Sequence, residues 1–267
     1  MLPLLLAACA PAPAREHGAQ PTIVSLNPCT DAILAEVADP AQILAVSHYS
    51  HDPASSSMDV AKARRWRATG GTVEEVLALR PDLVIGSTFT SPATAQALAR
   101  LGLRLERVGM AATVEDSKAQ VRQLAALAGH PTRGEALLAR IDAALAKAAP
   151  PPGPPINAVV WQSGGIVPGA GTLISDLLAR TGFANAAAAR GMQQADVLGL
   201  EPMLAAPPRV ILAAGNPHAG EDRMLHHPAL SALAGTRRER FDPALLWCGG
   251  PTIILAAERL AAVRRAL

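Results

Sequence analysis

The sequence predicts an α/β protein with two lobes, each built on a parallel sheet, joined by one long helix. Three observations lead to this prediction. Short runs rich in β-branched residues alternate with helical patterns, which is typical of parallel α/β architecture. A long helical tract followed by a proline-rich segment divides these runs into two groups. A short pattern of the first group also recurs in the second.

Six runs are predicted as strands because they are short, apolar and rich in β-branched residues. They are residues 22–26, 43–46, 82–86, 105–108, 157–161 and 209–213. After the fourth run, residues 114–129 and 132–149 show helical spacing, and PPPGPP at 150–155 cannot continue a helix. We therefore expect a signal and tether over 1–21, an amino-terminal lobe over 22–131, a connecting helix over 132–150 and a carboxyl-terminal lobe over 151–267.

An internal repeat supports the division into two lobes. EEVLALRPDLVI, starting at Glu74, and EPMLAAPPRVIL, starting at Glu201, share an acid, then Leu-Ala, a proline and an apolar run. Each copy predicts a short helix that ends before a proline and leads into a buried parallel strand. Two Rossmann-like lobes account for both copies.

The composition favours a globular protein and excludes a nucleic-acid partner. Half of the 267 residues are apolar, which allows a substantial core. The formal net charge of +2 comes from 24 basic and 22 acidic residues spread along the chain. No basic block of the kind that binds DNA or RNA is present in the sequence.

The first residues, MLPLLLAACAPAPAREHGAQP, predict an export signal followed by a tether. Their apolar run of about seven residues is far shorter than the roughly 20 that span a bilayer. Leu6, Ala7, Ala8 and Cys9 resemble the lipobox of bacterial lipoproteins, which makes Cys9 a candidate for lipidation. No Lys or Arg precedes the run, and an ordinary signal peptide cut elsewhere is the alternative.

Polar residues follow the predicted strands, at the sheet edge where parallel α/β folds bind ligands. In the first lobe they are Asn27, Cys29, His48, Tyr49, Ser50 and His51. In the second lobe Gln162 follows the strand at 157–161. We expect these side chains to contribute to one binding site.

The aromatic residues add to this site. Only seven are present, and five lie in predicted loops or lead into them: Tyr49, Trp66, Phe89, Trp161 and Trp247. Large aromatic side chains located in loops indicate a cleft for a large, partly apolar ligand. The alternative is that these rings fill gaps beneath the loops. Phe183 and Phe241 are predicted to be packing residues.

The chain resembles the periplasmic substrate-binding proteins of ABC importers for vitamin B12, iron-siderophores and haem, from about residue 22 onward. VEEVLALRPDLVIGS, GTLISDLLARTGFAN and GGPTIILAAERLAAV carry the resemblance. It is nearest to the cobalamin-binding member, with YSHDPA and Trp66 in one lobe and Pro251, Ile253, Ile254, Leu255, Ala256 and Ala257 in the other.

The resemblance implies a periplasmic receptor, monomeric and without enzymatic activity or a cofactor of its own. It would capture a metal chelate, most simply cobalamin or another corrinoid, with a ferric siderophore or haem as alternatives. It would deliver the ligand to an ABC permease and its ATPase, docking through Glu74 and Glu201. Contact with the membrane would be limited to a lipid on Cys9.

Cys29 and Cys248 depart from the cobalamin-binding member, with one in each lobe. They form either a disulfide that locks the lobes at a fixed opening or two free thiols that contact the metal of the ligand, and we slightly favour free thiols or a labile bridge. His48 and His51 show H-x-x-H spacing, which is too weak for a permanent metal site. We expect them to donate hydrogen bonds to the ligand or to offer a nitrogen to its metal.

Two other classes of protein remain as alternatives. Cys29 with His48 could serve a hydrolase or a redox enzyme, although no phosphate loop or nucleophile elbow is present in the sequence. A receptor for free metal ions would need several converging ligands, which His48, His51, Cys29 and Cys248 could supply.

Overall fold

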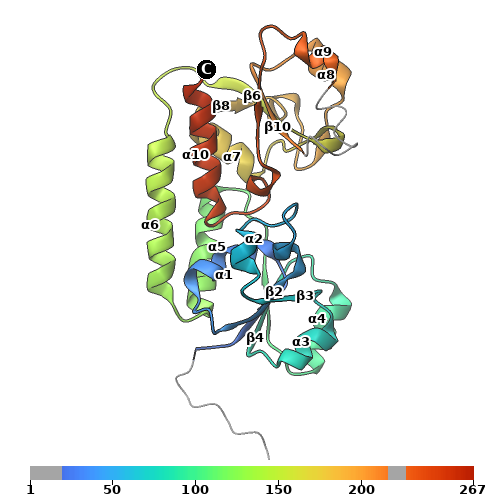
Figure 1. The fold of residues 1–267 in the computed structure, drawn as a ribbon, viewed down its shortest axis with the longest axis vertical. Helices are drawn as coiled ribbons and strands as arrows, with labels where there is room; N and C mark the ends of the chain where they lie inside the picture. Colours follow the sequence, from blue (N-terminus) through green and yellow to red (C-terminus); the bar gives the residue numbers. More distant parts are fainter. Residues whose placement is uncertain (1–19, 216–226) are drawn as a thin grey trace, which may run out of the picture.

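The computed structural model describes residues 20–215 and 227–267. Cys9 and nearly all of the expected tether lie outside the described residues. The described chain forms two lobes stacked along the long axis of the molecule (Figure 1). Each lobe contains one parallel sheet, as predicted.

The amino-terminal lobe contains a five-stranded sheet with the order β3-β2-β1-β4-β5. All neighbouring strands in it are parallel. The strands are β1 (Ile23–Ser25), β2 (Ile43–Ser47), β3 (Arg67–Thr69), β4 (Leu83–Ser87) and β5 (Leu105–Val108). The connecting helices are α1 (Pro28–Val37), η1 (His48–His51), α2 (Val60–Ala63), α3 (Val73–Leu79) and α4 (Pro92–Arg100).

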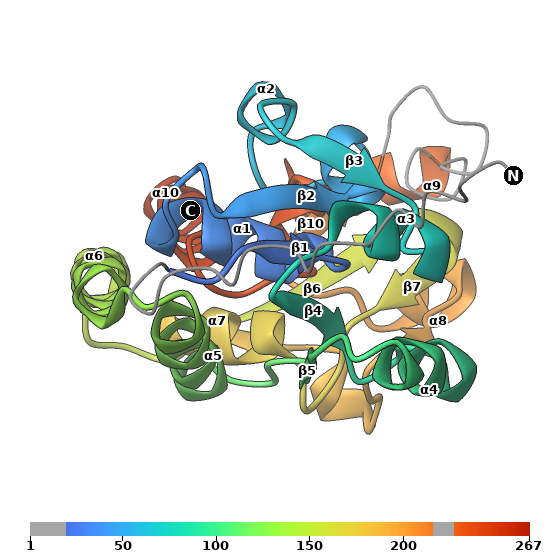
Figure 2. The same cartoon turned by 90° about the horizontal axis from the view of Figure 1, so that it is seen from below.

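The two faces of this sheet are covered by different helices. Val24, Val84 and Ala45 form one buried cluster with Val76 of α3 and Leu98 of α4. On the other face, Ile23 and Ile85 belong to a cluster that includes residues of α1 and α5 (Val114–Leu127). Figure 2 shows α3 and α4 on one side and α1 and α5 on the other.

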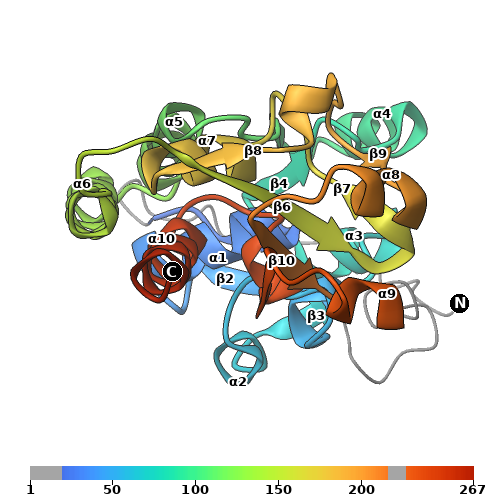
Figure 3. The same cartoon turned by 90° about the horizontal axis from the view of Figure 1, so that it is seen from above.

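The carboxyl-terminal lobe contains a four-stranded parallel sheet with the order β11-β10-β6-β8. Its strands are β6 (Ile156–Gln162), β8 (Phe183–Asn185), β10 (Val210–Ala214) and β11 (Arg237–Arg240), with an antiparallel pair β7 (Ile166–Val167) and β9 (Asp196–Val197) beside them. Its helices are η2 (Ser163–Gly165), α7 (Leu173–Arg180), η3 (Ala188–Arg190), α8 (Leu200–Ala205), α9 (Pro228–Ser231), η5 (Pro243–Leu245) and α10 (Thr252–Arg265). Helices α7 and α10 pack on one face of this sheet, and α8 and α9 pack on the other (Figure 3).

Helices α5 and α6 (Pro131–Ala148) connect the lobes. The hydroxyl of Thr113 and the carboxylate of Asp116 form a capping box that begins α5. Pro131 occupies the first turn of α6, where the missing amide hydrogen costs nothing, and the helix ends before the proline-rich segment. Helix α6 runs along the side of the molecule and contacts α5 and α10 (Figure 1).

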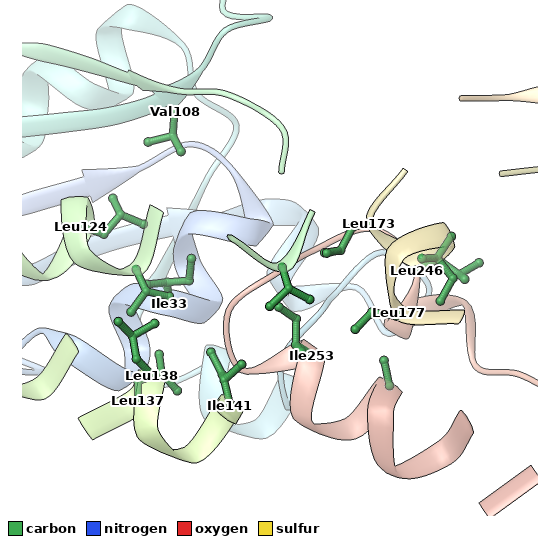
Figure 4. Packing of buried hydrophobic residues seen from close by; sticks show 14 of the residues in the cluster. Ile33, Val108, Leu124, Leu137, Leu138, Ile141, Leu173, Leu177, Leu246 and Ile253 are labelled. Atoms are coloured by element: carbon green, nitrogen blue, oxygen red, sulfur yellow. The ribbon is translucent and has the colours of Figure 1, made fainter. Parts of the chain in front are cut away.

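One hydrophobic cluster extends through both lobes. It joins Ile33 of α1 and Leu124 of α5 to Ile141 of α6, Leu177 of α7 and Ile253 of α10 (Figure 4). Each of these side chains is at most 2% exposed. The lobes therefore share apolar packing, and separating them would expose it to water.

All six predicted strands are present, and the predicted helices at 114–129 and 132–149 correspond to α5 and α6. Both copies of the repeat form a short helix that leads into a buried strand, α3 to β4 and α8 to β10. Phe183 and Phe241 are buried in the shared cluster, as predicted. Among residues 20–215 and 227–267, no helix combines the length and apolar character needed to cross a bilayer.

Candidate functional site

The carboxyl edge of the first sheet presents exposed apolar side chains. Tyr49 follows β2, Phe89 follows β4 and Met110 follows β5, and they are 50%, 72% and 60% exposed. In Figure 1, α2 lies on the side of this lobe that faces the carboxyl-terminal lobe. Ser57, just before α2, accepts a hydrogen bond at its carbonyl oxygen from the hydroxyl of Thr252 in the other lobe, at 3.3 Å.

Asp31 fixes the turn that carries Tyr49. Its Oδ2 accepts hydrogen bonds from the amide of Ser47 at 2.9 Å and from the hydroxyl of Ser50 at 2.6 Å. Complete burial raises the pKa of the Asp31 carboxyl to about 7, against hydrogen bonds from Ser25, Ser50 and Ser47 that lower it. Ser50 is itself fully buried, so the expectation that it contacts a ligand is wrong.

His48, Tyr49 and His51 share this turn, η1. The rings of His48 and Tyr49 lie with centroids 4.0 Å apart. Nδ1 of His48 lies 3.3 Å from the carbonyl oxygen of Thr69, and Nε2 of His51 lies 3.2 Å from that of Ala63. A carbonyl oxygen can only accept a hydrogen bond, so the ring nitrogen that faces it must carry a hydrogen. In the neutral rings, the lone pair therefore lies on the other nitrogen, which is Nε2 in His48 and Nδ1 in His51. His48 is exposed and His51 is half-buried.

The second lobe contributes its own exposed apolar side chains. Ile166 of β7 and Val197 of β9 are 37% and 62% exposed, and Trp247, after β11, is 59% exposed. Gln162 ends β6 and is 8% exposed, which leaves little of its surface for a ligand. Sequence reasoning missed Met110, Ile166 and Val197. Met110 could have been found, because it lies two residues after the predicted strand at 105–108.

Trp66 and Trp161 are not part of this surface, contrary to expectation. Trp66 is 8% exposed in the shared cluster, and its indole N–H donates to the carbonyl oxygen of Pro40 at 3.0 Å. Trp161 is fully buried against the helices α8 and α9, and its N–H donates to the carbonyl oxygen of Leu198 at 3.0 Å. Both rings fill the interior with their single polar atom satisfied, which is the alternative considered for them.

Cys29 and Cys248 form a disulfide between the lobes, with Cα atoms 4.9 Å apart. Of the alternatives, the structure has the disulfide, and free thiols that contact a ligand are not present at these two positions. Asn27 has a local role, since its side chain accepts from the amide of Cys29 at 2.8 Å and caps α1. Sγ of Cys29 lies 3.7 Å from the carbonyl oxygen of Trp247. The bond thus brings the exposed tryptophan of the second lobe to the carboxyl edge of the first sheet.

This bond argues against a cysteine-dependent hydrolase and against a receptor for free metal ions. A cysteine in a disulfide offers no thiolate, so Cys29 cannot serve as the nucleophile of a hydrolase while the bond is intact. In the described part of the chain, no group of three or more His, Cys, Asp or Glu side chains is placed to hold a metal ion. The four residues considered for a free metal ion do not converge on one.

Glu74 and Glu201 lie exposed in the first turns of α3 and α8. The neighbouring Glu75, not Glu74, satisfies local groups: it accepts from the hydroxyl of Thr69 and the amide of Gly70, both at 2.7 Å. These hydrogen bonds hold the pKa of Glu75 below its usual value. The carboxylate of Glu74 is thus not required for this local structure.

Residues 23–241 match the model of a family described as periplasmic binding protein. The chain belongs to this family. The fold class and the expectation of a binding protein without enzymatic activity are therefore confirmed.

Several solved structures share the fold. The haem-binding protein RhuT from Roseiflexus sp. RS-1 has a TM-score of 0.71 and 23% identity, covering 91% of this chain and 97% of that chain. A haem-binding protein from Pseudomonas aeruginosa has a TM-score of 0.68 and 22% identity, covering 91% and 92%. The vitamin B12-binding protein BtuF of Vibrio cholerae has a TM-score of 0.70 and 20% identity, covering 92% and 96%. No curated protein sequence matches the chain.

Proposed function

We propose that this protein is the receptor of an ABC importer and captures a metal tetrapyrrole between its two lobes. The observation that carries the proposal is the set of exposed aromatic and thioether side chains at the carboxyl edge of the first sheet, joined there by Trp247 of the second lobe. Tyr49, Phe89, Met110 and Trp247 are each at least half exposed. A planar macrocycle would bury such side chains, and their removal from water would stabilise the complex.

Haem is the tetrapyrrole that the exposed histidine favours. Nε2 of His48 carries the lone pair of the neutral ring and can ligate an iron with an open axial position. Tyr49 offers a phenol oxygen as a second candidate ligand on the same turn. The likeness to haem-binding structures supports this choice. Cobalamin is the second candidate, supported by the sequence resemblance and by the likeness to a vitamin B12-binding protein.

Delivery would take place at a permease with its ATPase, with Glu74 and Glu201 as one docking carboxylate on each lobe. A lipid on Cys9, which lies outside the described residues, would keep the receptor near the membrane. Asn27, His51 and Gln162 would contribute at the margin of the site through the atoms that their local hydrogen bonds leave available.

The test is a visible-absorbance titration of the purified protein with haem, cyanocobalamin, cobinamide and a ferric siderophore. We expect haem to bind, and His48→Ala to shift the Soret band and weaken binding because the iron loses its ligand. His130→Ala is the control, since Nε2 of His130 lies 2.8 Å from Oε1 of Gln42, which precedes β2 and so lies at the opposite edge of the sheet from η1. A shift in Tyr49→Phe alone would identify the phenol as the ligand instead.

A second pair of variants tests the apolar surface. Phe89→Ala should weaken tetrapyrrole binding by about 1 to 3 kcal/mol, the usual cost of losing an aromatic contact at a binding site. Leu101→Ala is the control, because Leu101 is 46% exposed at the end of α4, away from the carboxyl edge. Equal effects of the two variants, or failure of every tetrapyrrole to bind, would contradict the proposal.

A further inference from the structure

The segment that follows Trp247 is packed tightly against the first lobe. Cys248 is bonded to Cys29, and the amide of Gly250 donates to the hydroxyl of Ser117 on α5 at 2.7 Å. At Gly249, a Cβ atom would lie within 2.2 Å of that same hydroxyl oxygen. Gly249 thus allows an approach to α5 that other residues would prevent.

Gly250 also lies against α1. Its φ is +60°, and a Cβ atom there would come within 2.5 Å of Cγ1 of Ile33. The backbone from Cys248 to Gly250 is therefore held by a covalent bond, a hydrogen bond and close packing on two helices of the other lobe. Trp247 directly precedes this constrained backbone, and 59% of its surface is exposed to solvent.

The lobes have other links besides the disulfide. The shared cluster joins them through α1, α5, α6, α7 and α10. The amide of Val114 donates to Oδ2 of Asp176 at 2.8 Å, and the hydroxyl of Thr252 donates to the carbonyl oxygen of Ser57 at 3.3 Å. Breaking the disulfide would leave these links in place. The main effect of breaking it would therefore fall on residues 247–250, which adjoin Cys248.

We propose that the Cys29–Cys248 disulfide is a positioning element of the ligand site, which fixes Trp247 at the junction of the lobes and makes ligand affinity depend on thiol redox state. This inference rests on the proposed function. A side chain ordered before binding loses less conformational entropy when the ligand arrives. Once the bond is broken, Trp247 would become ordered only when the ligand binds. The entropy that it then loses would lower the affinity for the ligand.

The redox step is an ordinary exchange with a dithiol reductant. The reductant gives two electrons and two protons to the protein disulfide, so the sulfur-sulfur bond breaks and two thiols form at Cys29 and Cys248. The reductant becomes a disulfide in the same step. Oxidation of the protein by a disulfide oxidant reverses it.

The experiment compares haem affinity in four proteins: the native chain, Cys29→Ser with Cys248→Ser, Trp247→Ala, and the triple variant. We expect loss of the disulfide to raise Kd by about fivefold to tenfold, the order of gain that preorganisation of one large side chain provides. In the Trp247→Ala background, loss of the disulfide should have no further effect. Additive losses would overturn the inference, because the disulfide would then act independently of Trp247.

Reduction of the native protein by dithiothreitol provides a measurement that needs no variant to fold. It should raise Kd as the double serine variant does, and the same reductant should not affect that variant. Unchanged affinity of the reduced native protein would overturn the inference.

A readout without ligand separates this inference from the proposed function. In the double serine variant, hydrogen exchange should accelerate at residues 246–250 while α5, α6 and α10 keep their protection. X-ray scattering should give the same radius of gyration for both forms. An increased radius of gyration in the double serine variant would mean that the disulfide mainly keeps the lobes from opening. That result would overturn the inference. Should the native protein bind no tetrapyrrole, the proposed function fails, while the exchange data still test the positioning of Trp247.

Discussion

Asp31 supports the turn η1 from inside the protein, and its carboxyl group is fully buried. Burial raises its pKa from 3.8 to about 7, so the folded protein retains a proton that the unfolded chain releases in that interval. The stabilisation linked to this proton is present below pH 3.8 and is lost as the pH rises to about 7.

We therefore expect Asp31 to make the free energy of unfolding fall with rising pH over this interval, by at most about 1.4 kcal/mol per unit. Asp31→Asn keeps an acceptor for Ser47 and Ser50 but cannot ionise, so it should lack this part of the slope. Urea denaturation of both proteins at several pH values between 4 and 8 measures the difference. Parallel curves for the two proteins would contradict the assignment.

At the residue scale, the sequence identified Tyr49, Phe89 and Trp247 as exposed aromatics but also included two rings of the core. Trp161 lies in β6, where successive side chains alternate between the two faces of the sheet. Its position at the end of a predicted strand did not tell which face it takes. Trp66 lies just before β3, a strand that the sequence pattern does not predict, so the pattern places Trp66 in a loop.

At the element scale, the buried strands were predictable and several edge strands were not. β1, β4 and β10 are apolar throughout or nearly so, because both faces of a parallel sheet are covered. β3 and β11 read RAT and RRER, and charged residues are common on edge strands. Their hydrogen bonds come from the neighbouring strand, which no local pattern reveals.

The segment before α10 gives a prediction about Gly250. Gly250→Ala should lower the free energy of unfolding by about 1 to 3 kcal/mol, because the added methyl overlaps Ile33 and φ is positive. Gly235→Ala is the matched control, since a Cβ atom there meets nothing within 4 Å. Urea denaturation of both variants checks the prediction. Equal stability of both would mean that the segment can shift away from α1.

At the scale of the whole molecule, the two lobes and the connecting helix were predictable from the alternation of runs and from the proline-rich segment. Their shared core was not, because α10 contacts α6 from far along the chain. Packing between segments so distant in sequence leaves no periodic pattern. The pairing of Cys29 with Cys248 was open for the same reason.

The proposed docking role of Glu74 and Glu201 gives a prediction for transport. Charge reversal by Glu74→Lys with Glu201→Lys should leave ligand affinity unchanged and impair uptake in cells that carry the importer, because the receptor would repel a basic permease surface. Glu258→Lys, exposed on α10, is the control and should leave uptake intact. Loss of affinity in the double variant would contradict a separate docking role.

The disulfide has one more consequence for the molecule as a whole. The two cysteines are 219 residues apart in sequence, so their bond closes most of both lobes into a single covalent ring. A protease that cuts once within this ring would leave two fragments still joined through sulfur. Such a nicked receptor would run as one band in a denaturing gel without reductant and separate into two bands only when thiol is added.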